Sequence, residues 1–355
     1  MSDISKIDSN FKAAVIDGHE TAYYDVTAAP FVLEGFGWQD RPYYRVPGYF
    51  TTDEVGSGVL ALAKHTSGCC VRFKSNSSFI ALRSRLHSSC DMNHMPRCGS
   101  AGFDLYIKDK NGKFSFVKAV QPNAQEVDLE RLVYPDTPGG MTEYLLNLPL
   151  YGGVEKIELG VAPGSHIEAP TPHKIEKPIV FYGSSITQGG CASRPGNAYS
   201  NMLCRKLDAP QINLGFSGSG KGEPAFAEAI AKLDMSCFVL DYDHNAPNTE
   251  HLTATHETFF KIIRKKNPTL PILILSKCDF HDTGDDRARR EIIRKTYESA
   301  VAAGDKYVAF IDGELLWGET DRDACSVDGC HPNDLGFYRM AETIYPVLKE
   351  LLERR

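Results

Sequence analysis

The sequence lacks the features of exported and membrane-spanning proteins. No apolar run is long enough to cross a bilayer. Residues 1–10 are polar and have neither the basic nor the apolar region of a signal peptide. The ten cysteines follow no spacing that suggests a disulfide framework. We therefore expect a cytoplasmic protein with reduced thiols and no membrane partner.

Strong charge and repetition are also absent. The formal net charge is −7 over 355 residues, which favours solubility and argues against a nucleic-acid partner. We find no internal repeat and no low-complexity segment. A hydrophobic content of 42% is ordinary for a globular protein, and the length suggests two domains. The composition leaves open whether the protein is a homo-oligomer.

The first part of the chain, residues 1–165, is predicted to be an all-β sandwich of jelly-roll type. Its strand-like runs are short, and turn signals such as Asn-Gly at residues 111–112 separate them. Such spacing without a convincing helix indicates an all-β domain. The clearest runs are residues 59–63, 69–73, 79–82, 103–107, 114–120, 144–148 and 157–161. A linker rich in Pro and Gly follows at residues 162–172.

From residue 176 to residue 355, strand and helix patterns alternate. The expected strands are residues 179–182, 211–214, 237–240, 271–275 and 307–311. The expected helices are residues 198–207, 224–233, 249–265, 287–303 and 337–352. This alternation predicts a parallel sheet with helices on both faces. We expect a three-layer α/β domain with a flavodoxin-like sheet.

A serine stands at the carboxyl end of the first strand of this sheet. Residues 179–189 read Ile-Val-Phe-Tyr-Gly-Ser-Ser-Ile-Thr-Gln-Gly, an apolar run that meets Gly183 and then two hydroxyl residues. Ligands bind at this edge of open α/β sheets, which favours Ser185 as a nucleophile. The alternative is that Ser184 and Ser185 only cap a helix, a role that suits serine. This stretch alone leaves the two interpretations level.

Polar residues follow other strands of the sheet and would reach the same edge. His331 can act as a base, and Asp328 is close enough in sequence to orient its ring. Gly218 can offer an unobstructed backbone N–H, and Asn245 can offer a side-chain amide. A nucleophile, a base with its orienting carboxylate, and oxyanion donors are what acyl transfer by serine requires.

The sequence resembles the SGNH (GDSL-type) hydrolase superfamily, which is named for residues in four blocks. The matching segments are residues 183–187 (Gly-Ser-Ser-Ile-Thr), 213–218, 243–245 (Asp-His-Asn) and 328–331 (Asp-Gly-Cys-His). The resemblance implies Ser185 as nucleophile with Asp328 and His331. It also implies an oxyanion hole of the Ser185 and Gly218 N–H groups with Asn245. Two departures are that Ser184 replaces the usual Asp of Gly-Asp-Ser, and that the third block lacks its Gly and final Asp.

The resemblance is closer to the two-domain GDSL-like lipase/acylhydrolases, whose β-rich N-terminal domain carries a Gly-x-Asp-Leu-Tyr motif. Residues 102–106 read Gly-Phe-Asp-Leu-Tyr, and residues 189–196 are also similar to that branch. The resemblance implies a serine esterase for small acyl groups, with acetyl on a sugar as the best match to the appended β-domain. The substrate is then a small-molecule or oligosaccharide ester, and neither a metal nor an organic cofactor is needed.

Two other functions remain as alternatives. The same residues can pass the acyl group to an alcohol, which would make the protein an acyltransferase. A non-catalytic carbohydrate-binding protein would be expected to lack Ser185, Asp328 or His331, and all three are present.

The loop of residues 87–102 is long and precedes the Gly-Phe-Asp-Leu-Tyr motif. Long ordered loops are often functional, so we expect this loop to form one wall of the substrate pocket, with His94 as a substrate contact. The alternative is that the β-domain only covers an apolar face of the other domain. The loop's His and Cys residues lack the tight pairing of a zinc site, and we favour a structured loop over a metal site.

Five further residues have competing interpretations. Arg194 either steadies a polar substrate or forms an ion pair, and the sequence favours neither. His281 and Asp282 resemble a second catalytic pair, but no Pro follows His281 as it follows His331. Trp317 is expected in the core or at its rim, and Cys330 is expected to be a packing residue.

Overall fold

Two antiparallel sheets face each other in the N-terminal half of the chain. The computed structural model describes residues 13–278 and 283–354. One sheet has the order β1 (Ala13–Ile16), β2 (His19–Asp25), β10 (Val154–Val161), β5 (Ile80–Leu86), β8 (Asp128–Tyr134). The other has the order β11 (Ile167–Glu168), β4 (Cys70–Ser75), β9 (Thr142–Asn147), β6 (Phe103–Lys108), β7 (Phe114–Val120), and β3 (Val32–Glu34) pairs with β4. Inward residues such as Phe73, Leu82 and Leu146 form the core between them. The predicted β-sandwich is confirmed, whereas its jelly-roll connectivity stays a prediction.

One predicted strand of this half is a helix. Residues 59–63 overlap α1 (Thr52–Leu62), and a short helix, α2 (Arg97–Ser100), occurs later. Thr51 and Glu54 form a capping box at the start of α1. The helix is kinked at Gly56 (φ +79°), and Val55 and Val59 on either side of the kink are both buried in the core of the C-terminal half. The apolar run that begins at Val59 suggested a strand, but tertiary packing decides for a helix.

A five-stranded parallel sheet forms the centre of the C-terminal half. Its order is β13 (Gln211–Gly215), β12 (Ile179–Gly183), β14 (Cys237–Asp241), β15 (Ile272–Leu275), β16 (Val308–Ile311). The first strand, β12, lies between the second and the third. The second strand is therefore added on one side of β12, and all later strands are added on the other side. This is the flavodoxin-like order, and the prediction is confirmed.

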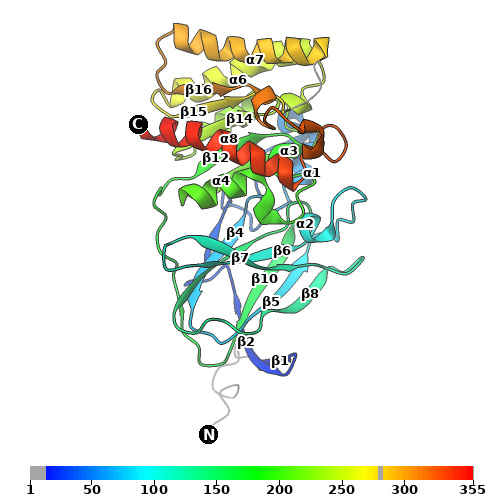
Figure 1. Cartoon of the computed structure of the whole chain (residues 1–355), viewed down its shortest axis with the longest axis vertical. Coiled ribbons are helices and arrows are strands. Elements are labelled where there is room, and N and C mark those ends of the chain that lie inside the picture. The colour runs from blue at the N-terminus through cyan, green and yellow to red at the C-terminus, as the bar shows by residue number, and fades with distance from the viewer. Residues whose placement is uncertain (1–12, 279–282, 355) are drawn as a thin grey trace.

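Helices cover both faces of that sheet, as Figure 1 shows. On β12, Val180 and Tyr182 point to one core and Ile179 and Phe181 to the other. The first core is covered by α1, α5 (Pro224–Ile230), α6 (Thr249–Lys266) and α7 (Gly284–Ala302), and the second by α4 (Tyr199–Leu207) and α8 (Asp334–Glu353). Short elements at the strand ends are α3 (Ser185–Gln188) and the 3₁₀ helices η2 (Pro195–Asn197), η3 (Asp243–Asn245), η4 (Gly313–Leu315) and η5 (Arg322–Cys325).

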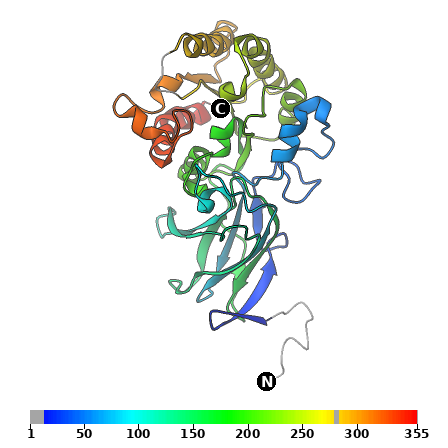
Figure 2. The same cartoon turned by 90° about the vertical axis from the view of Figure 1, so that its right-hand side faces the viewer.

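The two halves share their cores. Figure 2 shows α1, in blue, beside the α/β half although it belongs to the first 65 residues. Met95, Leu150 and Tyr151 are buried with α4 and α8 on the other face. The division into residues 1–165 and 176–355 therefore stays a prediction, since α1 packs with the second part and not with the sandwich.

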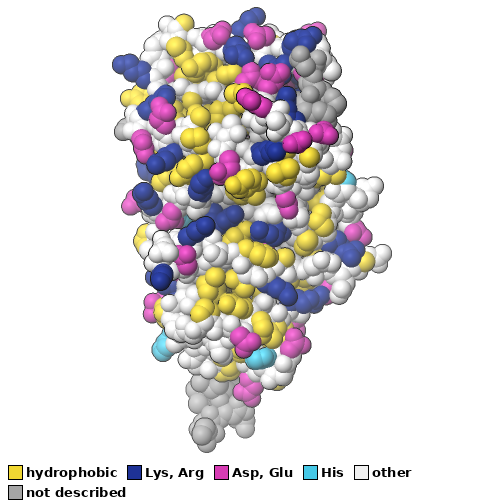
Figure 3. All heavy atoms as spheres, viewed as in Figure 1, with side chains coloured by type: hydrophobic (Ala, Val, Ile, Leu, Met, Phe, Trp, Pro, Cys, Tyr) yellow, Lys and Arg dark blue, Asp and Glu magenta, His cyan; other side chains and the backbone are white. Residues whose placement is uncertain are grey.

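The surface carries both signs of charge. On the face drawn in Figure 3, Lys and Arg are interspersed with Asp and Glu, and apolar side chains gather in small groups between them. Among the helices of residues 13–278 and 283–354, none is long and apolar enough to cross a membrane.

Candidate active site

Ser185 begins α3 directly beyond the carboxyl end of β12. The N-cap of this helix is Ser184, whose Oγ accepts the Ile186 N–H at 3.1 Å. A side chain at Gly183 would collide with Thr187 Oγ1 and the Asp241 carbonyl, so the turn requires glycine. The capping interpretation thus holds for Ser184 alone. The hydroxyl of Ser185 remains available for a different partner.

That partner is His331. The Ser185 Oγ lies 2.8 Å from His331 Nε2, and His331 Nδ1 lies 2.8 Å from Asp328 Oδ2. The other carboxylate oxygen of Asp328 accepts the N–H groups of Cys330 at 2.9 Å and of His331 at 2.7 Å. With Nδ1 donating to Asp328, the Nε2 atom is the one that can accept the Ser185 proton.

Asp328 stays ionised over the whole neutral range. Partial burial favours its neutral form, but hydrogen bonds from the backbone and ring of His331 and from the Cys330 N–H outweigh it. They lower the pKa of Asp328 to about 2. A carboxylate beside Nδ1 favours the charged imidazole that exists after proton uptake, so the three residues can activate a hydroxyl as a nucleophile.

Gly218 lies in the loop of residues 216–220, which follows β13. Its φ is +63°, a conformation that favours glycine, and the space where a side chain would stand is open. The preceding residue is fixed, because the Ser217 N–H donates to Gln188 Oε1 at 2.9 Å. Gly218 is exposed, so its backbone can be approached by a ligand.

Asn245 is not the free donor that the sequence led us to expect. Its Nδ2 donates to the carbonyl oxygens of Phe216 at 2.8 Å and Gly220 at 2.9 Å. An amide nitrogen carries two hydrogens, and both are used within the loop of residues 216–220. In this structure Asn245 closes the loop that carries Gly218, and its role as a direct oxyanion donor stays a prediction.

Arg194 is held by the N-terminal half. Its Nη1 lies 2.8 Å from Oδ2 of Asp104, which is fully buried, and it also donates to the Tyr106 hydroxyl. Its guanidinium lies 4.1 Å from the centre of the Phe116 ring. Of the two interpretations of Arg194, the ion pair is the one the structure shows, and the substrate contact stays a prediction.

Asp104 belongs to the Gly-Phe-Asp-Leu-Tyr motif and ties three segments together. Besides Arg194, it accepts the Gly196 N–H at 2.8 Å and the Asn147 amide at 2.8 Å. A side chain at Gly196 would collide with Tyr106, so the chain passes closely against the motif. The motif therefore fixes the loop of residues 189–196, which follows α3.

The loop of residues 87–102 reaches the catalytic edge. The His94 ring lies 6.3 Å from the His331 ring, edge to face. Cys98 Sγ donates to the Ser193 carbonyl at 2.8 Å, and Met95 is buried in the C-terminal core. Among the described residues, no group of three or more His, Cys, Asp or Glu is arranged to hold a metal ion.

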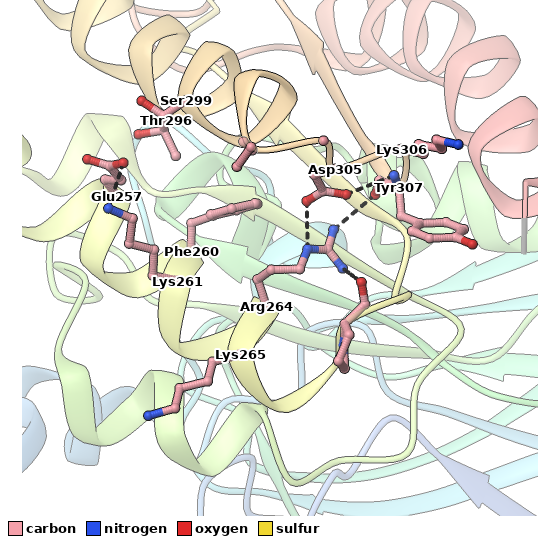
Figure 4. Close-up of a pocket in the computed structure, with 14 residues that line it drawn as sticks. Glu257, Phe260, Lys261, Arg264, Lys265, Thr296, Ser299, Asp305, Lys306 and Tyr307 are labelled. Carbon is pink, nitrogen blue, oxygen red and sulfur yellow. Dashed lines mark hydrogen bonds and ion pairs between the residues drawn. The ribbon is translucent and has the colours of Figure 1, made fainter.

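The structure also places Trp317 and Cys330, two of the remaining residues that the sequence singled out. Trp317 is fully buried in the core, and Cys330 Sγ lies 3.5 Å from Nδ1 of the half-buried His244. His281 and Asp282 lie outside the described residues. A cavity of about 660 Å³ between α6 and α7, lined by residues such as Phe260, Arg264 and Asp305, lies at the amino end of β16, the edge opposite to Ser185 (Figure 4).

Asp241 lies beneath the site and had no assigned role in the sequence. It ends β14, is buried, and accepts hydrogen bonds from Tyr199 at 2.7 Å and Thr187 at 2.9 Å. Burial raises the pKa of Asp241 to about 7, against these hydrogen bonds. A carboxyl group that titrates near neutrality thus supports the helix that carries Ser185.

Removing the Asp104 carboxylate should destabilise the fold, because Arg194 would lose its charged partner in a largely buried position. We expect Asp104→Ala to lower the free energy of unfolding by about 3 kcal/mol, measured by urea denaturation. The control is Asp128→Ala, whose ion pair with Arg85 is exposed and should matter little. If the two variants lowered the free energy of unfolding equally, the buried contacts of Asp104 with Arg194, Gly196 and Asn147 would not be a special source of stability.

The stability should also depend on Asp241. The unfolded chain loses this proton near pH 4 and the folded protein only near pH 7, so the folded state binds more protons between these values. Stability from this group therefore falls as the pH rises from 4 to 7. The free energy of unfolding of the wild type, relative to Asp241→Asn, should be lower at pH 8 than at pH 5. A difference that is the same at both pH values would show that Asp241 is already ionised at pH 5.

Comparison with solved structures gives close overall matches. A protein of Bacteroides ovatus, described as a GDSL-like lipase, is 31% identical with a TM-score of 0.84, over 94% of this chain and 98% of that one. A salicylyl-acyltransferase from a tetracycline biosynthetic pathway is 22% identical with a TM-score of 0.77, over 93% and 97%. An acetyl xylan esterase of Butyrivibrio proteoclasticus is 14% identical with a TM-score of 0.60, over 94% and 99%. The last two likenesses show the fold alone.

Family models match both halves of the chain. Residues 21–167 match the N-terminus of SGNH-hydrolase-type esterases, named for its Gly-x-Asp-Leu-Tyr motif. Residues 176–349 match the GDSL-like lipase/acylhydrolase family. No curated protein gave a significant match. With four blocks on one edge of a flavodoxin-like sheet and a β-sandwich clamped to it, this chain belongs to the GDSL-like lipase/acylhydrolase family of SGNH hydrolases.

Proposed function

We propose that this protein is a serine esterase that hydrolyses short-chain acyl esters, with acetyl esters of carbohydrates as the substrate class. The observation that carries the proposal is the hydrogen-bonded series Ser185, His331 and Asp328 at the carboxyl edge of the sheet. Membership of a hydrolase family supports it.

In the first half of the reaction, Ser185 Oγ attacks the carbonyl carbon of the ester while its proton passes to His331 Nε2. Asp328, ionised at neutral pH, balances the charge of the imidazolium. The tetrahedral intermediate then collapses, and the alcohol leaves with the proton from His331. In the second half, His331 takes a proton from water, which attacks the acyl-enzyme, and the returned proton restores the Ser185 hydroxyl.

The oxyanion would be bound by backbone N–H groups. Ser185 is the first residue of α3, so its N–H has no acceptor within the helix. The Gly218 N–H would be the second donor, because the glycine lies exposed in the loop beside Gln188. Asn245 would act on this donor through the loop, since it bridges the carbonyls of Phe216 and Gly220.

The carbohydrate part of the proposal rests on likeness. The solved structures that resemble the chain include an acetyl xylan esterase and carbohydrate esterases of family two. His94 is exposed and stands 6.3 Å from His331, ring to ring. We assign His94 to contact with the alcohol portion of the ester, on the side where the leaving group departs.

A second candidate is acyl transfer to an alcohol. It is favoured by the TM-score of 0.77 to the salicylyl-acyltransferase, against 0.60 to the acetyl xylan esterase. Both reactions share the acyl-enzyme and differ only in the acceptor. Product analysis with an alcohol present separates them: a transferase forms the new ester faster than the free acid.

The test of the proposed nucleophile compares two neighbouring serines. Ser185→Ala should lower the rate of p-nitrophenyl acetate hydrolysis by roughly 10⁴-fold or more, because the hydroxyl that forms the proposed acyl-enzyme is removed. Ser184→Ala removes only a helix cap, which costs about 1 kcal/mol of stability, and should keep most of the turnover. The reverse result would make Ser184 the nucleophile. Acetate, butyrate and octanoate esters, beside acetylated oligosaccharides, then define the substrate.

The role of Asn245 is tested by measuring stability and turnover together. Asn245→Ala takes the side-chain donor from the Gly220 carbonyl and from the Phe216 carbonyl, which keeps the Ser219 N–H at 3.0 Å, so it should lower the free energy of unfolding by about 1–3 kcal/mol and also lower kcat. The control is Asn267→Ala, since Asn267 likewise bridges two carbonyls, those of Ala231 and Ile263, away from the site. It should lower stability and leave kcat unchanged. If Asn245→Ala lowers kcat without any loss of stability, Asn245 is a direct donor.

A further inference from the structure

The carboxamide of Gln188 is a fully buried polar group at the end of the helix that carries Ser185. Each of its atoms has a partner. Its Oε1 accepts the Ser217 N–H at 2.9 Å, and its Nε2 lies 3.0 Å from His65 Nδ1 and donates to the Leu150 carbonyl at 3.2 Å. One side chain therefore joins the nucleophile helix, the loop of Gly218 and the N-terminal half.

The acceptor side of Gln188 fixes the loop of residues 216–220 just before Gly218. Ser217 donates its own N–H to Gln188, so the direction of the following peptide, which carries the Gly218 N–H, is restricted. The approach is close: a side chain at Gly215 would collide with the Gln188 backbone. Asn245 bridges the carbonyls of Phe216 and Gly220 on either side of this segment. The loop is thus held by two side chains through three hydrogen bonds.

The donor side of Gln188 depends on the N-terminal half. Burial, together with the nearby charge of Arg45, lowers the pKa of His65 to about 3. The ring is therefore neutral at neutral pH, and its Nδ1 can accept the Gln188 amide hydrogen. Ser67 adds a hydrogen bond to the Gln188 carbonyl at 2.6 Å. Replacing these residues would leave Gln188 attached to the loop but free to move.

Arg45, also from the N-terminal half, contacts both the end of β13 and His65. It is fully buried, and its Nη1 donates to the carbonyls of Asn213 at 2.7 Å and Gly215 at 3.0 Å, at the end of β13. Its Nε donates to the His65 carbonyl at 2.6 Å, and its guanidinium lies 4.7 Å from the centre of the Phe216 ring. Arg45 thus fixes both the strand from which the loop leaves and the residue that holds Gln188.

We infer that Gln188 is a positioning residue of the reaction, which orients the Gly218 N–H through Ser217 and makes that orientation depend on His65 and Leu150 of the N-terminal half. The inference rests on the proposed function, because it assigns Gly218 to the oxyanion. It differs from a role in domain attachment alone, in which Gln188 would contribute to stability and not to turnover.

Two substitutions separate the halves of the carboxamide. Gln188→Met removes the acceptor and the donors, and should lower kcat for p-nitrophenyl acetate towards the roughly 10²-fold loss that removal of an oxyanion donor causes, with little change in KM. Gln188→Glu keeps an oxygen to accept the Ser217 N–H. It should therefore retain a kcat well above that of Gln188→Met, although the donors to Leu150 and His65 are altered. Rescue by Glu is the result expected of a positioning role.

The matched control is Gln211→Met. Gln211 is also buried and donates to Asn201 at 2.8 Å, but it lies at the opposite end of β13. It should lose stability without losing kcat. If Gln188→Met behaves in the same way, with wild-type kcat in the folded protein, Gln188 is only structural and the inference is wrong.

Labelling by a fluorophosphonate distinguishes this failure from a failure of the proposed function. The phosphoryl oxygen uses the same donors as the oxyanion, so Gln188→Met should slow labelling of Ser185 to about the extent that it lowers kcat. If the wild type is labelled at Ser185 and Gln188→Met is labelled equally fast, the inference falls and the proposed function stands. If the wild type is not labelled at Ser185, both fall.

Discussion

The joining of the two halves depends on the hydrogen bonds and the ion pair made by the buried carboxylate of Asp104. A buried charge is costly unless it is paired and hydrogen-bonded. Here the partners are Arg194 and the Gly196 N–H from the C-terminal half and Asn147 from the sandwich. Separating residues 189–196 from the Gly-Phe-Asp-Leu-Tyr motif would therefore cost free energy, because the buried carboxylate would lose its partners. At its other end, the Gly190 N–H donates to the Ser185 carbonyl at 2.8 Å, so the clamp reaches the nucleophile within a few residues.

The site combines rigid elements with loops that buried polar side chains hold in place. Ser185 follows a strand that is buried on both faces, and His331 precedes the long helix α8. The loop of residues 216–220 has no such support of its own and is held by Gln188 and Asn245. Fully satisfied polar networks restrict a backbone more sharply than apolar contacts do. A buried group that shifts loses its hydrogen-bond partner and cannot replace it with water. This is the physical reason for so many buried amides around an exposed glycine.

The sequence predicted what local pattern and strand order control. The alternation after residue 176 was enough for a parallel sheet with helices on both faces, and the family resemblance then agreed with its flavodoxin-like order. Strand-end polar residues placed Ser185 together with His331, which the structure brings to 2.8 Å. Helix α1 was missed because its valines also suit a strand, and the decisive contacts come from Phe226 and neighbours far along the chain. Asn245 was identified, but the two carbonyls that occupy its amide could not be found by spacing.

Gln188 and Asp104 show why partners were harder to predict than positions. Gln188 is three residues from Ser185, and Asp104 is part of a recognisable motif, so both were visible in the sequence. Their partners are separated from them by long stretches: His65 by 123 residues from Gln188, and Arg194 by 90 residues from Asp104. Only the packing of the halves decides which buried donors meet which acceptors, and a single sequence has no periodicity that records it.

These contacts also bear on why the chain has two parts. Helix α1 does cover an apolar face, since Val55 and Val59 are buried in the same core as Phe226, so coverage explains part of the arrangement. Coverage alone would be satisfied by any apolar surface of suitable shape. It does not require Arg45 to donate hydrogen bonds to the carbonyls of Asn213 and Gly215. Nor does it require the Leu150 carbonyl to accept a hydrogen bond from Gln188 of the nucleophile helix. Directional bonds at those atoms constrain the loop of Gly218, which a covering surface would leave free. The groups that can do chemistry come from one half of the chain, and much of what holds them in register comes from the other.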